Sequence, residues 1–128
     1  MTEQEYTEGV LKTEAVNFSE IRERFTDENI RLLHAAMGMA TEAAEILDAV
    51  KKHIFYGKKL DILNLKEELG DSKWYSTILI DVLRSSVEEI NEINQRKLFA
   101  RYKNKAFSSE EAINRDVQKE QIEMDFGT

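Results

Sequence analysis

Two short acidic pairs are the residues of this sequence whose types and spacing could do chemistry. Glu42 and Glu45 form an E-x-x-E pair, and Glu68 and Asp71 form an E-x-x-D pair. A spacing of three residues places two side chains on one face of a helix. Because such pairs are also common on solvated helices, their meaning depends on the residues around them.

The first pair lies in a stretch with few other polar side chains. Residues 35–50 read AAMGMATEAAEILDAV, in which Asp48 is the only other ionisable residue. At about 100° per residue, Glu42 and Glu45 point away from a face that is shared by Met37, Ala40, Ala44 and Leu47. The face that carries the two glutamates is otherwise made of small apolar residues, whereas a solvated face would normally be more polar. This pattern therefore predicts that the helix is buried. Its small residues leave room for something bulky: Ala35, Gly38 and Ala49.

The second pair continues an apolar stripe. Glu68 and Asp71 share a sector of the helical wheel with four less polar residues: Tyr75, Ile78, Leu79 and Val82. Carboxylates are seldom buried unless paired, and four together repel one another unless they are protonated or bound to cations. Solvation at a rim is the alternative, but two inward-facing pairs on adjacent helices favour a cation site.

The ligand types narrow the choice of metal. A cluster made only of carboxylates suits Mg²⁺, Mn²⁺ or Ca²⁺. A di-iron bundle requires Glu-x-x-His, and neither His34 nor His53 has a glutamate three residues before it. The chain has no cysteine for a thiolate zinc site and no EF-hand loop.

Length and composition predict a single soluble helical domain. The chain has 128 residues, no proline and 5 glycines, so little interrupts helices. A net charge of −7 without a basic stripe argues against nucleic-acid binding. The apolar runs are too short to cross a membrane, and the N-terminus does not resemble a signal peptide. The absence of cysteine is typical of a reducing compartment, so a cytoplasmic location is expected.

The helical signals predict an all-α fold with a four-helix-bundle-like core over about 28–103, completed by oligomerisation. Asp27 and Asp61 are the expected N-caps of the two central helices, and Gly57 is expected to end the first of them. Ser-x-x-Glu capping boxes begin at Ser86 and Ser108. The expected segments are a short helix at 3–12, an apolar stripe at 18–25, helices at 28–56, 62–84 and 87–103, and a terminal helix with Ile113 and Val117 on one side.

One face of the 87–103 helix begins apolar and becomes basic and amidic at Asn94, Lys97 and Arg101. These long side chains can extend to solvent at the end of a bundle. Beside an acidic metal cluster, the same basic row could instead neutralise the outer oxygens of a metal-bound polyphosphate. Both interpretations remain open from the residues alone.

The lysines around Gly57 and the aromatic Tyr75 also have both a structural and a functional interpretation. The lysines around Gly57 complement the negative end of a helix dipole, or alternatively contact phosphate, with Lys52 lying on the side of Glu45; they are Lys51, Lys52, Lys58 and Lys59. Tyr75 could belong to the core or touch a ligand ring. No glycine-rich phosphate loop is present, so a phosphate would have to be held by side chains.

Three segments resemble the MazG-like branch of the all-α nucleoside triphosphate pyrophosphohydrolases. They read TEAAEILDAVKK, EELGDxxWY and NxxKLxxRY, and the similarity covers roughly residues 30–115. The resemblance implies a Mg²⁺-dependent helical enzyme that works as a homodimer or homotetramer. Such an enzyme cleaves an NTP or dNTP between the α and β phosphates, giving a monophosphate and pyrophosphate.

The resemblance also assigns roles to residues. The metal ligands would be Glu42, Glu45, Glu68 and Asp71, with Mn²⁺ as a possible substitute for Mg²⁺. Asn94, Lys97 and Arg101 would lie along the polyphosphate. Glu67 is a further acid that could orient or deprotonate water, although an exposed role without chemistry is an equal alternative. Many members carry another glutamate at the position of Thr41, so the number of metal ions stays open.

Two alternatives come from other functional classes. One is a non-catalytic helical dimerisation or regulatory module, and the other is a metal-dependent nucleotide sensor without turnover. Inward-facing carboxylates argue against the first, because they destabilise a core that never binds metal.

Overall fold

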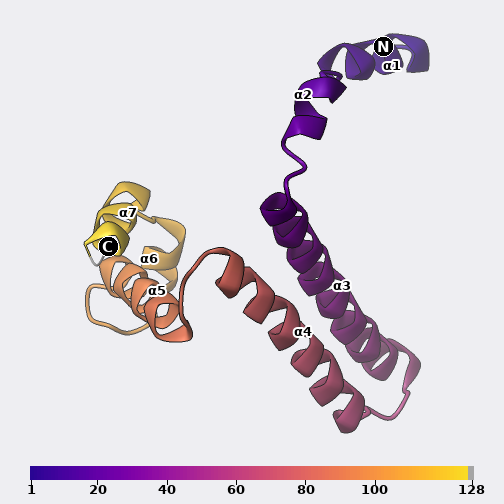
Figure 1. Ribbon diagram of the computed structural model, residues 1–128. Helices are drawn as coiled ribbons and strands as arrows, with labels where there is room; N and C mark the ends of the chain where they lie inside the picture. The colour runs from indigo at the N-terminus through magenta and orange to yellow at the C-terminus, as the bar shows by residue number, and fades with distance from the viewer. Residues whose placement is uncertain (127–128) are drawn as a thin grey trace. The chain divides into compact units, whose positions relative to one another are not determined.

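The computed structural model describes residues 1–126, which form seven helices and no strand (Figure 1). The predicted all-α fold is therefore confirmed. The helices are α1 (Glu3–Thr13), α2 (Phe18–Glu23), α3 (Asp27–Tyr56), α4 (Ile62–Val82), α5 (Val87–Arg101), α6 (Ser109–Ile113) and α7 (Val117–Asp125).

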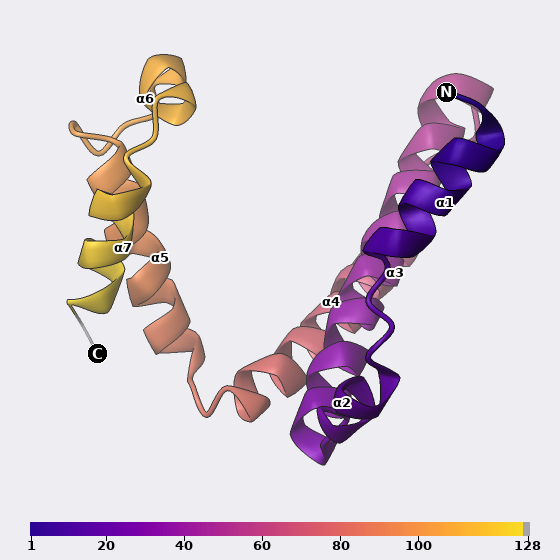
Figure 2. The ribbon, with the colours of Figure 1, turned by 90° about the horizontal axis from the view of Figure 1, so that it is seen from above.

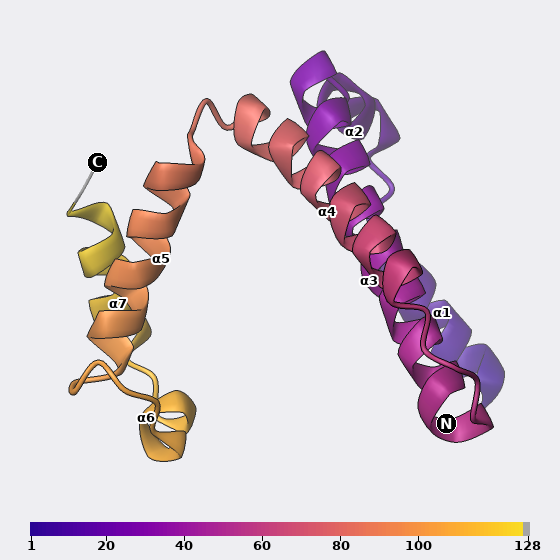
Figure 3. The ribbon, with the colours of Figure 1, turned by 90° about the horizontal axis from the view of Figure 1, so that it is seen from below.

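The chain divides into two compact units, the first spanning Met1–Tyr75 and the second beginning at Ser76. In the first unit α3 packs against the N-terminal part of α4, as contacts between Gly38 and Tyr75 show. In the second unit α5 and α7 lie side by side (Figure 2, Figure 3). Pairwise helix packing is compatible with a bundle-like core, and the single domain over 1–128 stays a prediction.

The central helices are delimited by their caps. The Thr26 hydroxyl accepts a hydrogen bond from the Asn29 amide at 3.3 Å, so the predicted cap at Asp27 is wrong by one residue. Gly57 ends α3 with a φ of 67°, a left-handed conformation that glycine adopts without steric cost. The Asp61 carboxylate accepts from the Asn64 amide at 3.0 Å, as expected for the cap of α4.

The packing of α3 against α4 depends on the smallest residues of α3. Ala35 and Gly38 are buried, and a Cβ atom at Gly38 would lie 2.2 Å from the nearest ring carbon of Tyr75. The Tyr75 ring also meets His34 and Trp74 edge-on, at centroid distances of 5.7 and 5.0 Å. The space that the small residues leave on the acidic face of α3 is thus filled by an aromatic ring of α4.

The expected single terminal helix is wrong. α6 ends at Ile113, and α7 starts after Asp116, whose side chain accepts from the Lys119 amide at 3.0 Å. Ile113 and Val117 therefore belong to different helices. The cause is local, because an aspartate that hydrogen-bonds the backbone two or three residues ahead favours a new helix start over continuation of the old one.

The pairing of helices leaves much apolar surface exposed. Among the described residues, Ala35 is the only hydrophobic residue that is buried. Met37 and Leu47 of α3 are 59% and 67% exposed, and they belong to the face that points away from Glu42. Monomeric proteins rarely expose contiguous apolar patches of this kind.

None of the helices within residues 1–126 is long and apolar enough to cross a membrane.

Candidate metal centre

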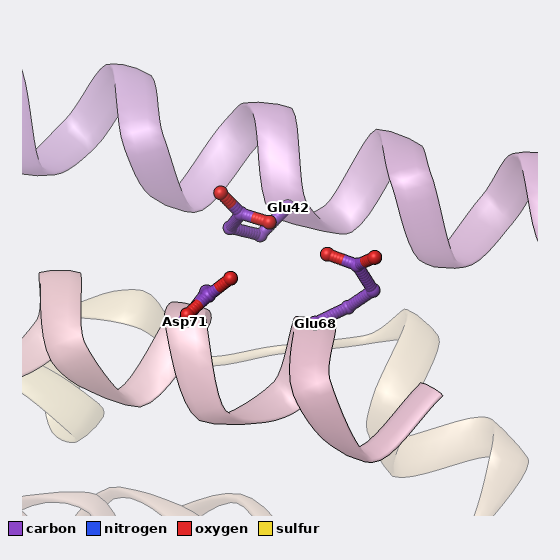
Figure 4. A group of neighbouring side chains, drawn as sticks. All are labelled: Glu42, Glu68 and Asp71. Atoms are coloured by element: carbon purple, nitrogen blue, oxygen red, sulfur yellow. The ribbon is translucent and has the colours of Figure 1, made fainter. Parts of the chain in front are cut away.

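Three of the predicted ligands converge between α3 and α4. Glu42 projects from α3 toward Glu68 and Asp71, which project from successive turns of α4 (Figure 4). One carboxylate oxygen from each residue lies within 4.8 Å of the others. Ligands on opposite sides of one Mg²⁺ are about 4.2 Å apart, and somewhat farther apart around Ca²⁺. Small side-chain movements therefore suffice for the three to share a divalent cation.

Glu68 is the most enclosed member of this acidic cluster. Its side chain is 8% exposed, whereas Glu42 is half-buried and Asp71 is exposed. The Asn64 amide donates a hydrogen bond to Glu68 Oε1 at 2.6 Å. Because Asn64 lies one helical turn before Glu68, this bond fixes the carboxylate within its own helix and turns it toward α3.

The fourth predicted ligand, Glu45, lies beside the same carboxylate. Both Glu42 and Glu45 are within hydrogen-bonding reach of Glu68. Glu45 is exposed and does not belong to the group of three that meets within 4.8 Å. The structure thus brings three of the four acids together and places Glu45 near enough to Glu68 to influence its protonation.

The mutual proximity of these groups changes their proton affinities. Burial, followed by the hydrogen bond to Glu68, raises the pKa of Glu42. The same Glu68 contact raises the pKa of Glu45. Hydrogen bonds from Glu45 and from Asn64 lower the pKa of Glu68. Among the three glutamates, the pKa of Glu68 is therefore lowered while those of its two neighbours on α3 are raised.

Two further candidates of the sequence analysis lie on α4. Tyr75 is half-buried against Gly38 and the neighbouring rings, so its ring serves the packing of α3 on α4. Glu67 is exposed and lies outside the group formed by Glu42, Glu68 and Asp71.

The basic row of α5 belongs to the second unit. Asn94 is exposed and Lys97 is half-buried. Arg101 pairs with the buried Glu120 of α7, with Nε 2.9 Å from Oε1. Arg115 pairs with the same carboxylate at 2.6 Å. These two guanidinium groups lower the pKa of Glu120 to about 2, so Arg101 has a structural partner within its own unit.

Replacing Glu120 with alanine is expected to destabilise the packing of α5 against α7. Removing the carboxylate leaves Arg101, whose side chain is 15% exposed, without its partner, and breaking a buried pair in this way costs about 3 kcal/mol or more. Urea unfolding of the variant measures the loss, and an unchanged midpoint contradicts the structural role.

The pairing of Glu120 with the arginines also makes the stability of the protein depend on pH. Because the pKa of Glu120 is lowered from 4.5 to about 2, its contribution to stability is complete above pH 4.5 and is lost as the pH falls toward 2. The alanine variant should lack this component of acid sensitivity.

A cavity of about 410 Å³ adjoins the acidic cluster in the first unit. Glu45 and Glu68 contribute to its lining, and so does Lys52, whose ammonium lies 2.5 Å from Asp48. Lys58, Lys59 and Asn64 also line it. None of these three was among the predicted site residues, although the spacing of Asn64 four residues before Glu68 is a usable signal.

No protein-family model matches the chain, and no curated protein or solved structure matches it significantly.

Proposed function

We propose that this chain is a Mg²⁺-dependent nucleoside triphosphate pyrophosphohydrolase that converts an NTP or dNTP to the monophosphate and pyrophosphate. The observation that supports this proposal most strongly is the convergence of Glu42, Glu68 and Asp71 from two helices, with Glu45 beside them. The resemblance of the same segments to the MazG-like family agrees with it.

The donor set fits the proposed metal. Four neighbouring carboxylates repel one another, and the hydrogen bond from the neutral Asn64 amide does not cancel their negative charge. A divalent cation supplies the missing positive charge. When bound, Mg²⁺ polarises phosphate oxygens and lowers the pKa of water. Asn64 keeps Glu68 directed toward α3, and partners of this kind are needed to hold metal ligands in position.

Three side chains of the second unit could donate to phosphate, but one of them already has a partner. Asn94 and Lys97 can donate to phosphate oxygens, and among the described residues no carboxylate lies within ion-pair distance of Lys97. Arg101 can do so only by sharing or leaving Glu120. Within the second unit Lys97 is therefore the more available cation, and a role of this row as a polyphosphate contact stays a prediction.

Turnover separates this proposal from its rivals. A nucleotide sensor would bind the Mg²⁺ complex of a triphosphate and leave it intact, and a silent dimerisation module would bind neither metal nor nucleotide. The direct test is a screen of the common NTPs and dNTPs with Mg²⁺, scored for pyrophosphate. We expect release with at least one substrate and none when EDTA is present. If the protein binds the triphosphate but releases no pyrophosphate, it is a nucleotide sensor and the enzymatic proposal is wrong.

We also propose that the chain works as a homodimer or homotetramer. The face of α3 that carries Met37 and Leu47 is exposed, and burying such residues releases about 1.5–3 kcal/mol for each large side chain. A second copy presents the same face, so two copies can cover each other through a symmetric interface.

Mg²⁺ is expected to raise the melting temperature of the protein. A ligand that binds only the folded state at about 100 times its Kd stabilises it by roughly 2.7 kcal/mol. Glu68→Gln should remove most of this shift, because Glu68 is the most enclosed member of the group of three carboxylates. Differential scanning calorimetry with and without MgCl₂ measures the shift. A full shift in Glu68→Gln would take this residue out of the site.

A further inference from the structure

The cavity beside the acidic cluster is lined by two lysines that have no assigned role. It lies between the C-terminal part of α3 and the start of α4, and the connecting loop at 57–61 contributes to it. Lys58 and Lys59 belong to this loop. The cavity holds about 410 Å³, and no aromatic side chain lines it.

The acids of the cavity are already matched with partners, apart from those of the cluster. Asp48 lies 3.1 Å from Lys51 and 2.5 Å from Lys52. Asp61 accepts the Asn64 amide at the start of α4. Glu45 and Glu68 belong to the proposed metal centre and would be offset by its cation.

The loop lysines, in contrast, have unmatched charges. In the part of the chain that the structure describes, no carboxylate lies within ion-pair distance of the ammonium group of Lys58 or Lys59. Once Asp48 and the cluster are neutralised, the two lysines face the single negative charge of Asp61, so the loop side of the cavity keeps an excess of positive charge.

Backbone contacts hold Lys58, the first of these two lysines, in place. Gly57 ends α3 in a left-handed conformation. The Lys58 amide donates to the Lys52 carbonyl at 3.2 Å, and His53 Nδ1 donates to the Lys58 carbonyl at 2.8 Å. The backbone at the start of the loop is thus held by its own hydrogen bonds, so binding at Lys58 costs less conformational entropy.

We propose that this lysine-lined cavity binds the terminal diphosphate of the substrate, with Lys58 and Lys59 as its contacts. This inference rests on the proposed function, because the metal centre fixes where the polyphosphate begins. An anion that spans a divalent cation and two lysines must carry charge at two places along its length. A diphosphate does so, whereas a single carboxylate or orthophosphate does not.

The arrangement also gives the substrate a direction along the helix pair. The diphosphate end points toward the loop at 57–61, and the nucleoside lies on the other side of the cluster. The leaving pyrophosphate would then carry its developing charge beside Lys58 and Lys59, where ammonium donors stabilise it.

Calorimetric titration with inorganic pyrophosphate in MgCl₂ tests this proposal without requiring turnover. The test variant is the double substitution Lys58→Ala/Lys59→Ala. Its matched control is Lys12→Ala/Lys66→Ala, which removes two exposed lysines of the same unit that do not line the cavity. We expect the Kd for pyrophosphate to rise about ten- to hundredfold in the test variant and to stay near the wild-type value in the control.

Mg²⁺ binding to the free protein, measured in the same way, should be unchanged in both variants, and circular dichroism should show unchanged helix content. Equal pyrophosphate affinity in the wild type and the test variant would overturn the assignment, as would a wild type that does not bind pyrophosphate.

The two proposals fail separately. If the wild type releases pyrophosphate from a triphosphate but the test variant binds pyrophosphate normally, the cavity assignment is wrong and the enzymatic proposal stands. If the test variant loses pyrophosphate affinity but the wild type cleaves no triphosphate, the diphosphate site stands and the enzymatic proposal is wrong.

Discussion

Asp71→Asn is expected to reduce kcat/KM for pyrophosphate release by at least about a hundredfold and to raise the Mg²⁺ concentration needed for half-maximal activity. The substitution keeps the shape of the side chain but removes one of the charges that face Glu42 and Glu68. Mutating residues that merely orient metal ligands typically costs 10- to 100-fold, so losing a ligand should cost at least as much. Steady-state kinetics over a range of Mg²⁺ concentrations provides the measurement.

A matched control uses an acid outside the site. Glu23 of α2 is exposed and belongs to the same unit, so Glu23→Gln removes the same charge without touching the cluster. Wild-type kinetics are expected for this control. Wild-type kinetics in Asp71→Asn as well would show that the convergence of the acids has no catalytic meaning.

The second large effect concerns assembly. Leu47→Asp is expected to convert the oligomer to a species near the monomer mass of 14.9 kDa. In a symmetric interface the substitution occurs twice, so the lost burial of two leucines alone costs about 3 kcal/mol or more, which is over a hundredfold in Kd. The buried unpaired aspartate adds a further penalty. Light scattering coupled to gel filtration measures the mass at micromolar concentration.

The control for assembly is an apolar residue outside the central helices. Val16 lies between α1 and α2 and is exposed, so Val16→Asp should leave the mass unchanged. A wild-type mass of 14.9 kDa at micromolar concentration would contradict the proposed self-association directly.

The sequence contained most of the information on where the helices lie. The absence of proline and the regular spacing of apolar residues predicted the helical fold, and Gly57 and Asp61 marked the turn between α3 and α4 correctly. Caps are short-range signals, so neighbouring candidates compete. Thr26 caps α3 in place of Asp27 for this reason, and Asp116 starts a helix that periodicity alone would have merged with the preceding one.

The candidate site was predictable in part. Spacing alone placed Glu42 with Glu45 and Glu68 with Asp71, and the antiparallel connection at 57–61 brings the two pairs together. Tertiary contacts were not readable from the pattern. Arg101 was expected beside phosphate, but its partner Glu120 lies 19 residues further along the chain. The lysines of the loop at 57–61 had been explained by the helix dipole, because their enclosure with Glu45 and Glu68 is a property of the folded pair.

The most direct test of the proposed reaction is phosphorus NMR of the products formed in oxygen-18 water. A triphosphate identified in the substrate screen is incubated with the protein and Mg²⁺, and the isotope shifts of the products are read. Attack of water on the α-phosphate predicts equal amounts of monophosphate and pyrophosphate, with one labelled oxygen in the monophosphate and none in the pyrophosphate. Labelled pyrophosphate, release of orthophosphate, or intact triphosphate after prolonged incubation would contradict the proposed function.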